Sequence, residues 1–138
     1  MKNSLTFFLV LASWTIYAQS DNPKLIGQWE GFQGADSMTF VFEKDSIVTM
    51  LNKTKKETIG GRENVREGRK VRTIYSVDLS ERPFAIDLII QETETNHEQG
   101  RMKGIFVFLG ENKMKINFGP GNSRPTTFDQ FSVTMTKE

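Results

Sequence analysis

Apolar and polar residues alternate along most of the chain from residue 25 onward. Large apolar side chains stand at positions 38, 40 and 42, and again at 114, 116 and 118. A period of two is typical of a strand with one buried face. Clusters of turn-forming residues separate the alternating segments. The pattern predicts about eight short strands, at 25–32, 38–43, 46–52, 71–79, 84–90, 104–109, 113–118 and 131–136, with a further strand around 55–59 left open.

A sustained 3.6-residue period is missing after the N-terminal segment, so helices contribute little. Successive antiparallel hairpins favour a meander, and this number of strands usually closes into a barrel or packs as a sandwich. Closure also removes the sheet edges that promote aggregation. We therefore predict an all-β, antiparallel, up-and-down barrel over residues 25–138.

The N-terminus has the features of a targeting segment. Lys2 supplies a positive charge, and the chain from Leu5 to the small residue Ala18 is apolar apart from Thr6, Ser13 and Thr15. A positive start, an apolar run and a small residue indicate a secretory signal peptide. The run is short for a membrane helix, which needs about 20 apolar residues. We expect a signal peptide over 1–18, a polar leader over 19–24, and export to a periplasm or the exterior.

Composition excludes several classes of chemistry. The 138 residues include no cysteine and one histidine, and their formal net charge is +1. Disulfides, cysteine-based metal sites, thiol catalysis and multi-histidine metal sites are therefore excluded. A near-neutral charge gives no general attraction to nucleic acid. We expect a monomer with no cofactor, no metal and no nucleic-acid partner. Peripheral association with a membrane stays open.

A set of phenylalanines on the predicted strands favours ligand binding. An eight-stranded barrel has an interior that is either filled by side chains or wide enough for one small ligand. Our first hypothesis is non-catalytic binding of a small apolar or amphipathic molecule in a cavity lined by Phe40, Phe42, Phe106, Phe108 and Phe118. A side-chain-filled interior is the alternative.

Charge is unevenly distributed along the chain. Residues 53–72 hold eight Lys or Arg against three Glu, whereas residues 78–98 hold six acidic residues and one Arg. The basic segment is either a solvated loop or a basic lip at the barrel mouth. The lip would include Arg62, Arg66, Arg69 and Arg72. Our second hypothesis follows from these loops: an envelope protein-interaction module or inhibitor with a filled barrel.

Catalytic and metal-binding patterns are weak in this sequence. His97 lies near Glu94 and Glu98, which together could bind zinc weakly, but a lone loop histidine is more often simply solvated. Asp87 alternates with apolar neighbours on a predicted strand and is expected to point outward. The sequence contains no nucleophile elbow, phosphate loop or zinc-protease motif. We therefore expect no catalytic residues and no enzymatic activity.

Several motifs together suggest a family resemblance. Gly27-Gln28-Trp29 opens the first predicted strand and resembles the Gly-X-Trp signature of lipocalins. Three later stretches resemble, in order and spacing, a bacterial, planctomycete-rich lipocalin-like domain family of unknown function: Pro83-Phe84-Ala85-Ile86-Asp87-Leu88, Gly104 to Ile116, and Arg124-Pro125-Thr126-Thr127-Phe128. The resemblance implies a lipocalin-like barrel and implies no particular activity.

The resemblance also implies roles for three residues. Trp29, with Gly27, would close one end of the barrel, and Arg124 would stack its guanidinium on the indole. The alternatives are that Trp29 stacks on a ligand and that Arg124 contacts an anion at the surface.

Overall fold

The computed structural model describes residues 23–138, so the predicted signal peptide (1–18) and most of the predicted leader (19–24) lie outside the described residues. The described chain is all-β. Within these residues, no helix is long and apolar enough to cross a membrane. Ten strands follow one another: β1 Gly27–Gln33, β2 Asp36–Phe42, β3 Val48–Asn52, β4 Glu57–Gly60, β5 Asn64–Arg66, β6 Arg69–Asp78, β7 Phe84–Glu92, β8 Glu98–Phe108, β9 Lys113–Phe118 and β10 Val133–Lys137.

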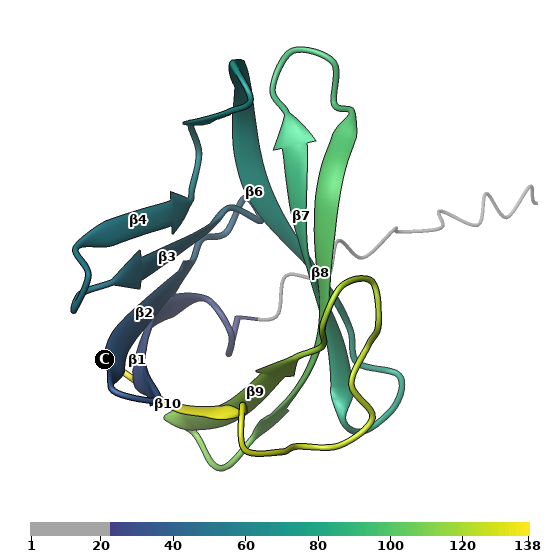
Figure 1. Ribbon diagram of the computed structural model, residues 1–138. Helices are drawn as coiled ribbons and strands as arrows, with labels where there is room; N and C mark the ends of the chain where they lie inside the picture. Colours follow the sequence, from purple (N-terminus) through teal and green to yellow (C-terminus); the bar gives the residue numbers. More distant parts are fainter. Residues whose placement is uncertain (1–22) are drawn as a thin grey trace, which may run out of the picture.

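The strands form one antiparallel sheet that curls into a nearly closed barrel (Figure 1). Its order is β4-β3-β2-β1-β10-β9-β8-β7-β6-β5, which is an up-and-down meander joined through the pairing of β1 with β10. Only β4 and β5, at the two ends of this order, have one neighbour each among the described strands. Antiparallel barrel architecture is therefore confirmed.

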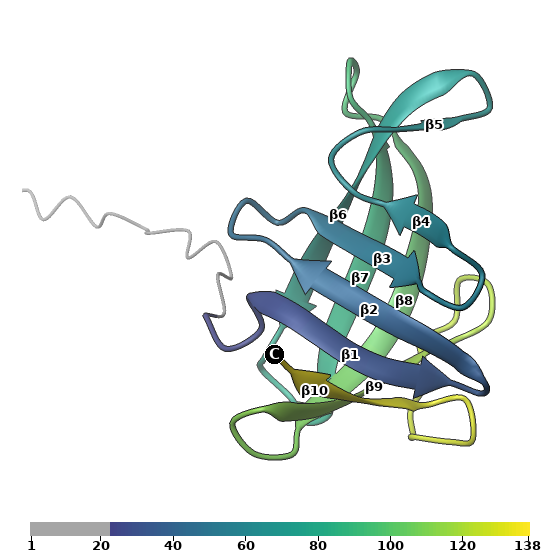
Figure 2. The ribbon, with the colours of Figure 1, turned by 90° about the vertical axis from the view of Figure 1, so that its left-hand side faces the viewer.

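Contacts between the β3 and β6 regions close the ring. Ile47 and Ile74 form an isolated antiparallel bridge. The amide of Tyr75 donates a 2.8 Å hydrogen bond to the carbonyl of Ser46. The amide of Thr73 donates a 2.9 Å hydrogen bond to Gly61. Beyond this closure β4 and β5 do not pair with each other, and Figure 2 shows β5 lying apart from β4.

The structure has two strands beyond the expected eight, β4 and β5, and both lie in the charged segment 53–72. β4 falls where the pattern leaves a further strand open around 55–59, whereas β5 is not expected. Their side chains are mostly exposed, so no apolar alternation marks them. Each pairs through its backbone with one neighbour, β4 with β3 and β5 with β6. Backbone pairing needs no apolar side chain. The remaining eight strands make the ring itself.

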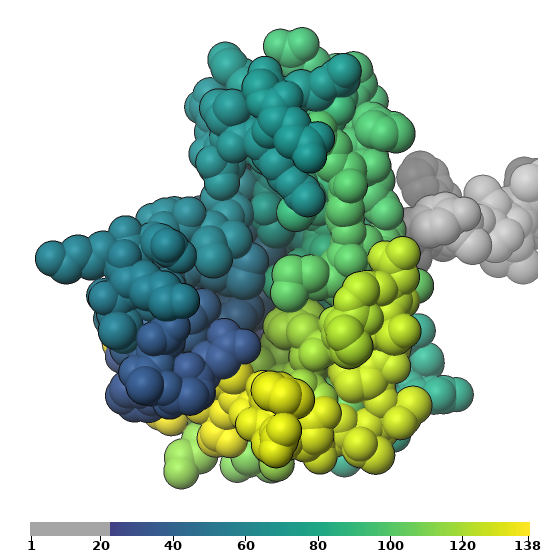
Figure 3. Space-filling view, in the orientation of Figure 1, coloured from purple at the N-terminus to yellow at the C-terminus, as the bar shows by residue number. Residues whose placement is uncertain are grey.

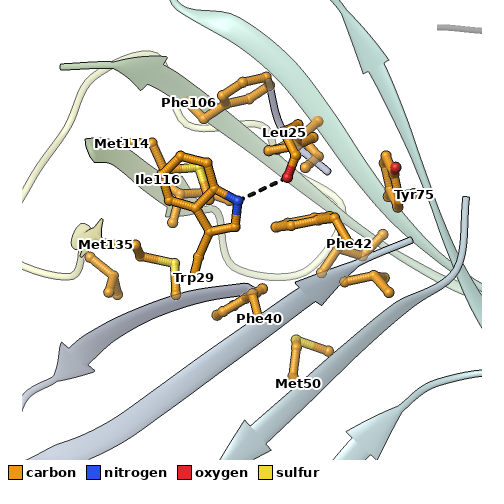
Figure 4. Packing of buried hydrophobic residues seen from close by; sticks show 14 of the residues in the cluster. Leu25, Trp29, Phe40, Phe42, Met50, Tyr75, Phe106, Met114, Ile116 and Met135 are labelled. Atoms are coloured by element: carbon orange, nitrogen blue, oxygen red, sulfur yellow. Dashed lines mark hydrogen bonds between the residues drawn. The ribbon is translucent and has the colours of Figure 1, made fainter. Parts of the chain in front are cut away.

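Inward-facing side chains of the ring pack into one core (Figure 4). The indole of Trp29 is fully buried in it, and its Nε1–H donates a 2.8 Å hydrogen bond to the carbonyl of Leu25. Leu25, which precedes β1, is itself fully buried. The chain entering β1 therefore covers one end of the core. Phe42 and Phe106 are buried in the same cluster.

Candidate functional site: an apolar mouth

Two adjoining pockets lie at the end of the barrel where β4 and β5 diverge. Their volumes are about 220 Å³ and about 250 Å³, and both are lined by Met50, Ile59 and Met102. Because they share these side chains, we treat them as one cleft, called the mouth. Figure 3 shows the molecule hollowed between the strands drawn in blue and teal, those in green and the C-terminal segment in yellow.

Side chains alternate between the two faces of each strand, and apolar side chains from several strands point into the mouth. The first pocket is lined by Met38 and Phe40 from β2, Met50 from β3, and Phe118 from β9. Methionine is flexible and polarizable, so a surface made from it adapts to differently shaped apolar groups. The mouth is therefore apolar and adaptable.

The rim of the mouth is apolar and exposed. Ile59 and Met102 have 45% and 41% of their surface accessible, and Val65 and Phe131 have 66% and 67%. All four line one or both pockets. Apolar side chains gathered on a surface commonly mark a binding site, whereas isolated ones carry no such meaning. The rim thus continues the apolar lining outward.

The five phenylalanines that we expected to line one cavity lie in three different environments. Phe40 and Phe118 line the mouth. Phe42 and Phe106 are 1% and 0% exposed and belong to the packed core. Phe108 packs near Trp29, with ring centroids 6.3 Å apart. The sequence analysis emphasised phenylalanine and passed over methionine as a lining residue, although Met38 shares the alternation of Phe40 and Phe42.

Trp29 and Gly27 meet a different cation from the one expected. Lys137 places its Nζ 5.6 Å from the centroid of the Trp29 ring. A side chain at Gly27 would lie only 2.7 Å from Cε of Lys137, so this glycine makes room for the lysine. Trp29 is fully buried, which fits a structural role. The expected stacking of Arg124 on Trp29 is wrong.

Arg124 instead fastens the segment between β9 and β10 to the outer face of the sheet. Its Nη2 donates to Asp87 at 2.7 Å, and its Nη1 donates to the carbonyl of Gly104 at 2.8 Å. Asp87 also accepts a 2.6 Å hydrogen bond from Arg101. Hydrogen bonds to Glu98 and Asp87 raise the pKa of the Arg101 guanidinium. A polar groove of about 510 Å³ lies beside Arg124, outside the barrel.

The four arginines of the predicted basic lip take different positions. Arg62 pairs with Asp45 at 2.6 Å. Arg69 pairs with Glu92 at 3.0 Å. Arg72 donates to Gln91 at 2.9 Å and to Asn96 at 2.6 Å. Arg66 lines the mouth. Partners elsewhere in the fold therefore engage much of the positive charge that the sequence concentrates in 53–72.

Glu92 is the buried centre of a polar cluster next to the mouth. Its carboxylate accepts hydrogen bonds from Gln99 at 2.9 Å, Thr95 at 2.8 Å and Arg69 at 3.0 Å. The hydrogen bonds from Gln99 and Thr95, together with the positive charge of Arg69, hold the pKa of Glu92 below its usual value. Among residues 23–138, no group of three or more His, Cys, Asp or Glu side chains could hold a metal ion.

Comparisons with known proteins found no relative. No protein-family model matches the chain, and neither the curated proteins nor the solved structures that were compared contain a match. The resemblance to lipocalin-like domains therefore stays a prediction from the motifs.

Proposed function

We propose that this protein is an exported, non-catalytic, lipocalin-like barrel that binds a small apolar or amphipathic molecule in the mouth. One observation carries the proposal: the apolar lining of the mouth is continuous with an exposed apolar rim. Covering such a rim removes apolar surface from water, which stabilises the covered state by roughly 25 cal/mol for each Å² of apolar surface buried. A ligand entering the mouth would supply that cover. Export rests on the sequence pattern of residues 1–18.

The chemistry of the lining favours binding over catalysis. Apolar side chains predominate, and the polar ones are Gln33, Asn64, Arg66 and Thr73. Ligand sites usually combine an apolar wall with a few polar groups that orient the ligand. General acid–base catalysis would instead need a proton-transferring group within reach of the substrate.

The alternative, an envelope interaction module acting through the charged loops, has less support. Arg62 and Arg69, two of the arginines that such a surface would present, already pair with acidic residues of the same chain. Charge reversal at Arg66 and Arg69 would still weaken capture of a partner if this alternative held.

A charged residue in the shared wall of the mouth tests the proposal. Met102→Glu places a carboxylate in both pockets at a residue that is 41% exposed, so folding should survive. Leu109→Glu makes the same kind of change at a 52% exposed position outside both pockets. We expect Met102→Glu to weaken uptake of 1-dodecanol at least about tenfold, which corresponds to 1.4 kcal/mol, and Leu109→Glu to leave it unchanged. Equal uptake by both variants would contradict binding in the mouth.

A further inference from the structure

Arg66 reaches across the open end of the barrel. It lies on β5, at one edge of the sheet, yet a side chain built at Gly100 on β8 would meet its Nη1 at 3.2 Å. Gly100 lies two residues before Met102 on the same strand, so both positions share a face. Met102 lines the mouth. The Arg66 guanidinium therefore lies over the inner face of β8, above the apolar wall.

The side chain of Arg66 lies between an apolar pocket and a polar pocket. Arg66 lines the apolar pocket of about 250 Å³ and also a polar pocket of about 370 Å³. The polar pocket contains Glu92, Gln99 and Glu98. A ligand that extended from the mouth toward the polar pocket would thus contact apolar side chains first and then the guanidinium of Arg66.

Nearby carboxylates are already matched with other cations. Glu92 pairs with Arg69 at 3.0 Å, and Glu98 pairs with Arg101 at 2.6 Å. Within residues 23–138, Arg66 has no carboxylate at ion-pair distance. Glu67 follows Arg66 in the turn before β6 and lines the polar pocket, so its charge opposes an anion there. Arg66 remains the cation with its donors available at the mouth.

We propose that the mouth takes a single-chain amphipath with an anionic head, and that Arg66 binds the head. This inference rests on the proposed function and names the class of its ligand. The planar guanidinium offers paired donors that fit a carboxylate or a phosphate. The apolar chain lies against Met50 and Met102, and the head reaches the boundary where the polar pocket begins.

Calorimetric titration of the whole protein with three probes near neutral pH tests this assignment. Dodecanoate and dodecyl phosphate carry the two anionic heads, and 1-dodecanol carries a neutral one. Arg66→Met keeps much of the aliphatic stem and removes the donors. Arg62→Met is the matched control, because it removes an equal charge from the same segment at an arginine that pairs with Asp45.

We expect Arg66→Met to weaken dodecanoate or dodecyl phosphate binding at least about tenfold, since hydrogen bonds to charged groups contribute about 1.5–3 kcal/mol. Binding of 1-dodecanol should change less than about twofold, and Arg62→Met should bind all three probes like the wild type. The anion that loses more identifies the head. Removing the opposing charge with Glu67→Gln should tighten binding of that anion.

Two results would overturn the assignment while leaving the proposed function standing. One is equal weakening of anion binding by Arg66→Met and Arg62→Met. The other is wild-type binding of 1-dodecanol as tight as that of the anion that binds more tightly. Binding of none of the three probes would contradict the proposed function as well. Urea unfolding of each variant confirms that folded proteins are being compared.

Discussion

The guanidinium of Arg124 and the carboxylate of Asp87 lie 2.7 Å apart on the outer face of the barrel. Arg124 belongs to the segment between β9 and β10, and Asp87 belongs to β7. A second hydrogen bond joins Arg124 to the carbonyl of Gly104. The pair thus fastens a long connection, which includes the rim residue Phe131, to the strands behind the mouth.

Loss of this attachment should loosen the connection. We expect Arg124→Met to lower the free energy of unfolding by about 1–2 kcal/mol, because a hydrogen-bonded charge pair that is partly buried is lost. Hydrogen exchange should also rise in residues 119–131. Arg82→Met, another charge removal on the β6–β7 connection, is the control. Unchanged exchange in 119–131 would show that other contacts hold the segment.

The hydrogen bond from Trp29 to Leu25 should contribute to stability at the covered end of the barrel. Trp29→Phe removes the indole donor and leaves unfilled volume at a fully buried position. We expect the free energy of unfolding to fall by about 2–4 kcal/mol, measured by urea denaturation. Phe32→Leu, at a 68% exposed position of the same strand, should change it by less than about 0.5 kcal/mol. A similar small effect at Trp29 would contradict the packing described above.

Glu92 should make stability depend on pH. Its pKa in the folded protein lies below the usual 4.5, so the stabilisation that it provides is present above about pH 4.5 and is lost as the pH falls through the folded value. Urea denaturation at about pH 7 and about pH 3 should therefore show a smaller acid loss for Glu92→Gln than for the wild type. Glu111→Gln, in the β8–β9 turn, is the control. Equal acid losses in wild type and Glu92→Gln would contradict this role.

Gly104 gives the Phe118 ring its place in the wall of the mouth. A Cβ at Gly104 would lie 2.7 Å from the ring and 2.8 Å from the carbonyl of Asn117. We expect Gly104→Ala to cost about 1–3 kcal/mol through overpacking, and to weaken 1-dodecanol binding because Phe118 must shift. Gly100→Ala is the matched control, since its Cβ meets only the flexible ends of Arg66 and Ile90, at 3.2 Å and 3.8 Å. Equal stability of the two variants would contradict this account.

The sequence pattern predicted those strands that have one apolar face and one polar face. The expected strand 113–118 coincides with β9, because its apolar and charged residues alternate without interruption. The pattern missed the first half of β8, which begins at Glu98, between the expected strands 84–90 and 104–109. That half pairs with β7 through backbone hydrogen bonds and carries mainly polar side chains, so nothing in its sequence separates it from a loop.

The site was less accessible to sequence reasoning than the fold. Phe40 and Phe106 both fall on strands at inward positions, yet only Phe40 lines the mouth. Whether an inward side chain lines the mouth or packs in the core depends on its position along the barrel axis. That position is set by the stagger of the strands and not by the alternation of side chains. The position of Arg66 over Gly100 likewise depends on how far β5 folds across the opening. Pairing between distant segments decides both.

Native mass spectrometry of the protein purified gently from the cells that naturally produce it, or from their medium, tests the central claim most directly. The account predicts a small-molecule adduct that is lost on denaturation, absent from Met102→Glu and retained by Leu109→Glu. Wild-type protein that carries only its bare mass, and that still takes up neither 1-dodecanol nor dodecanoate when these are added, would contradict a ligand-binding mouth.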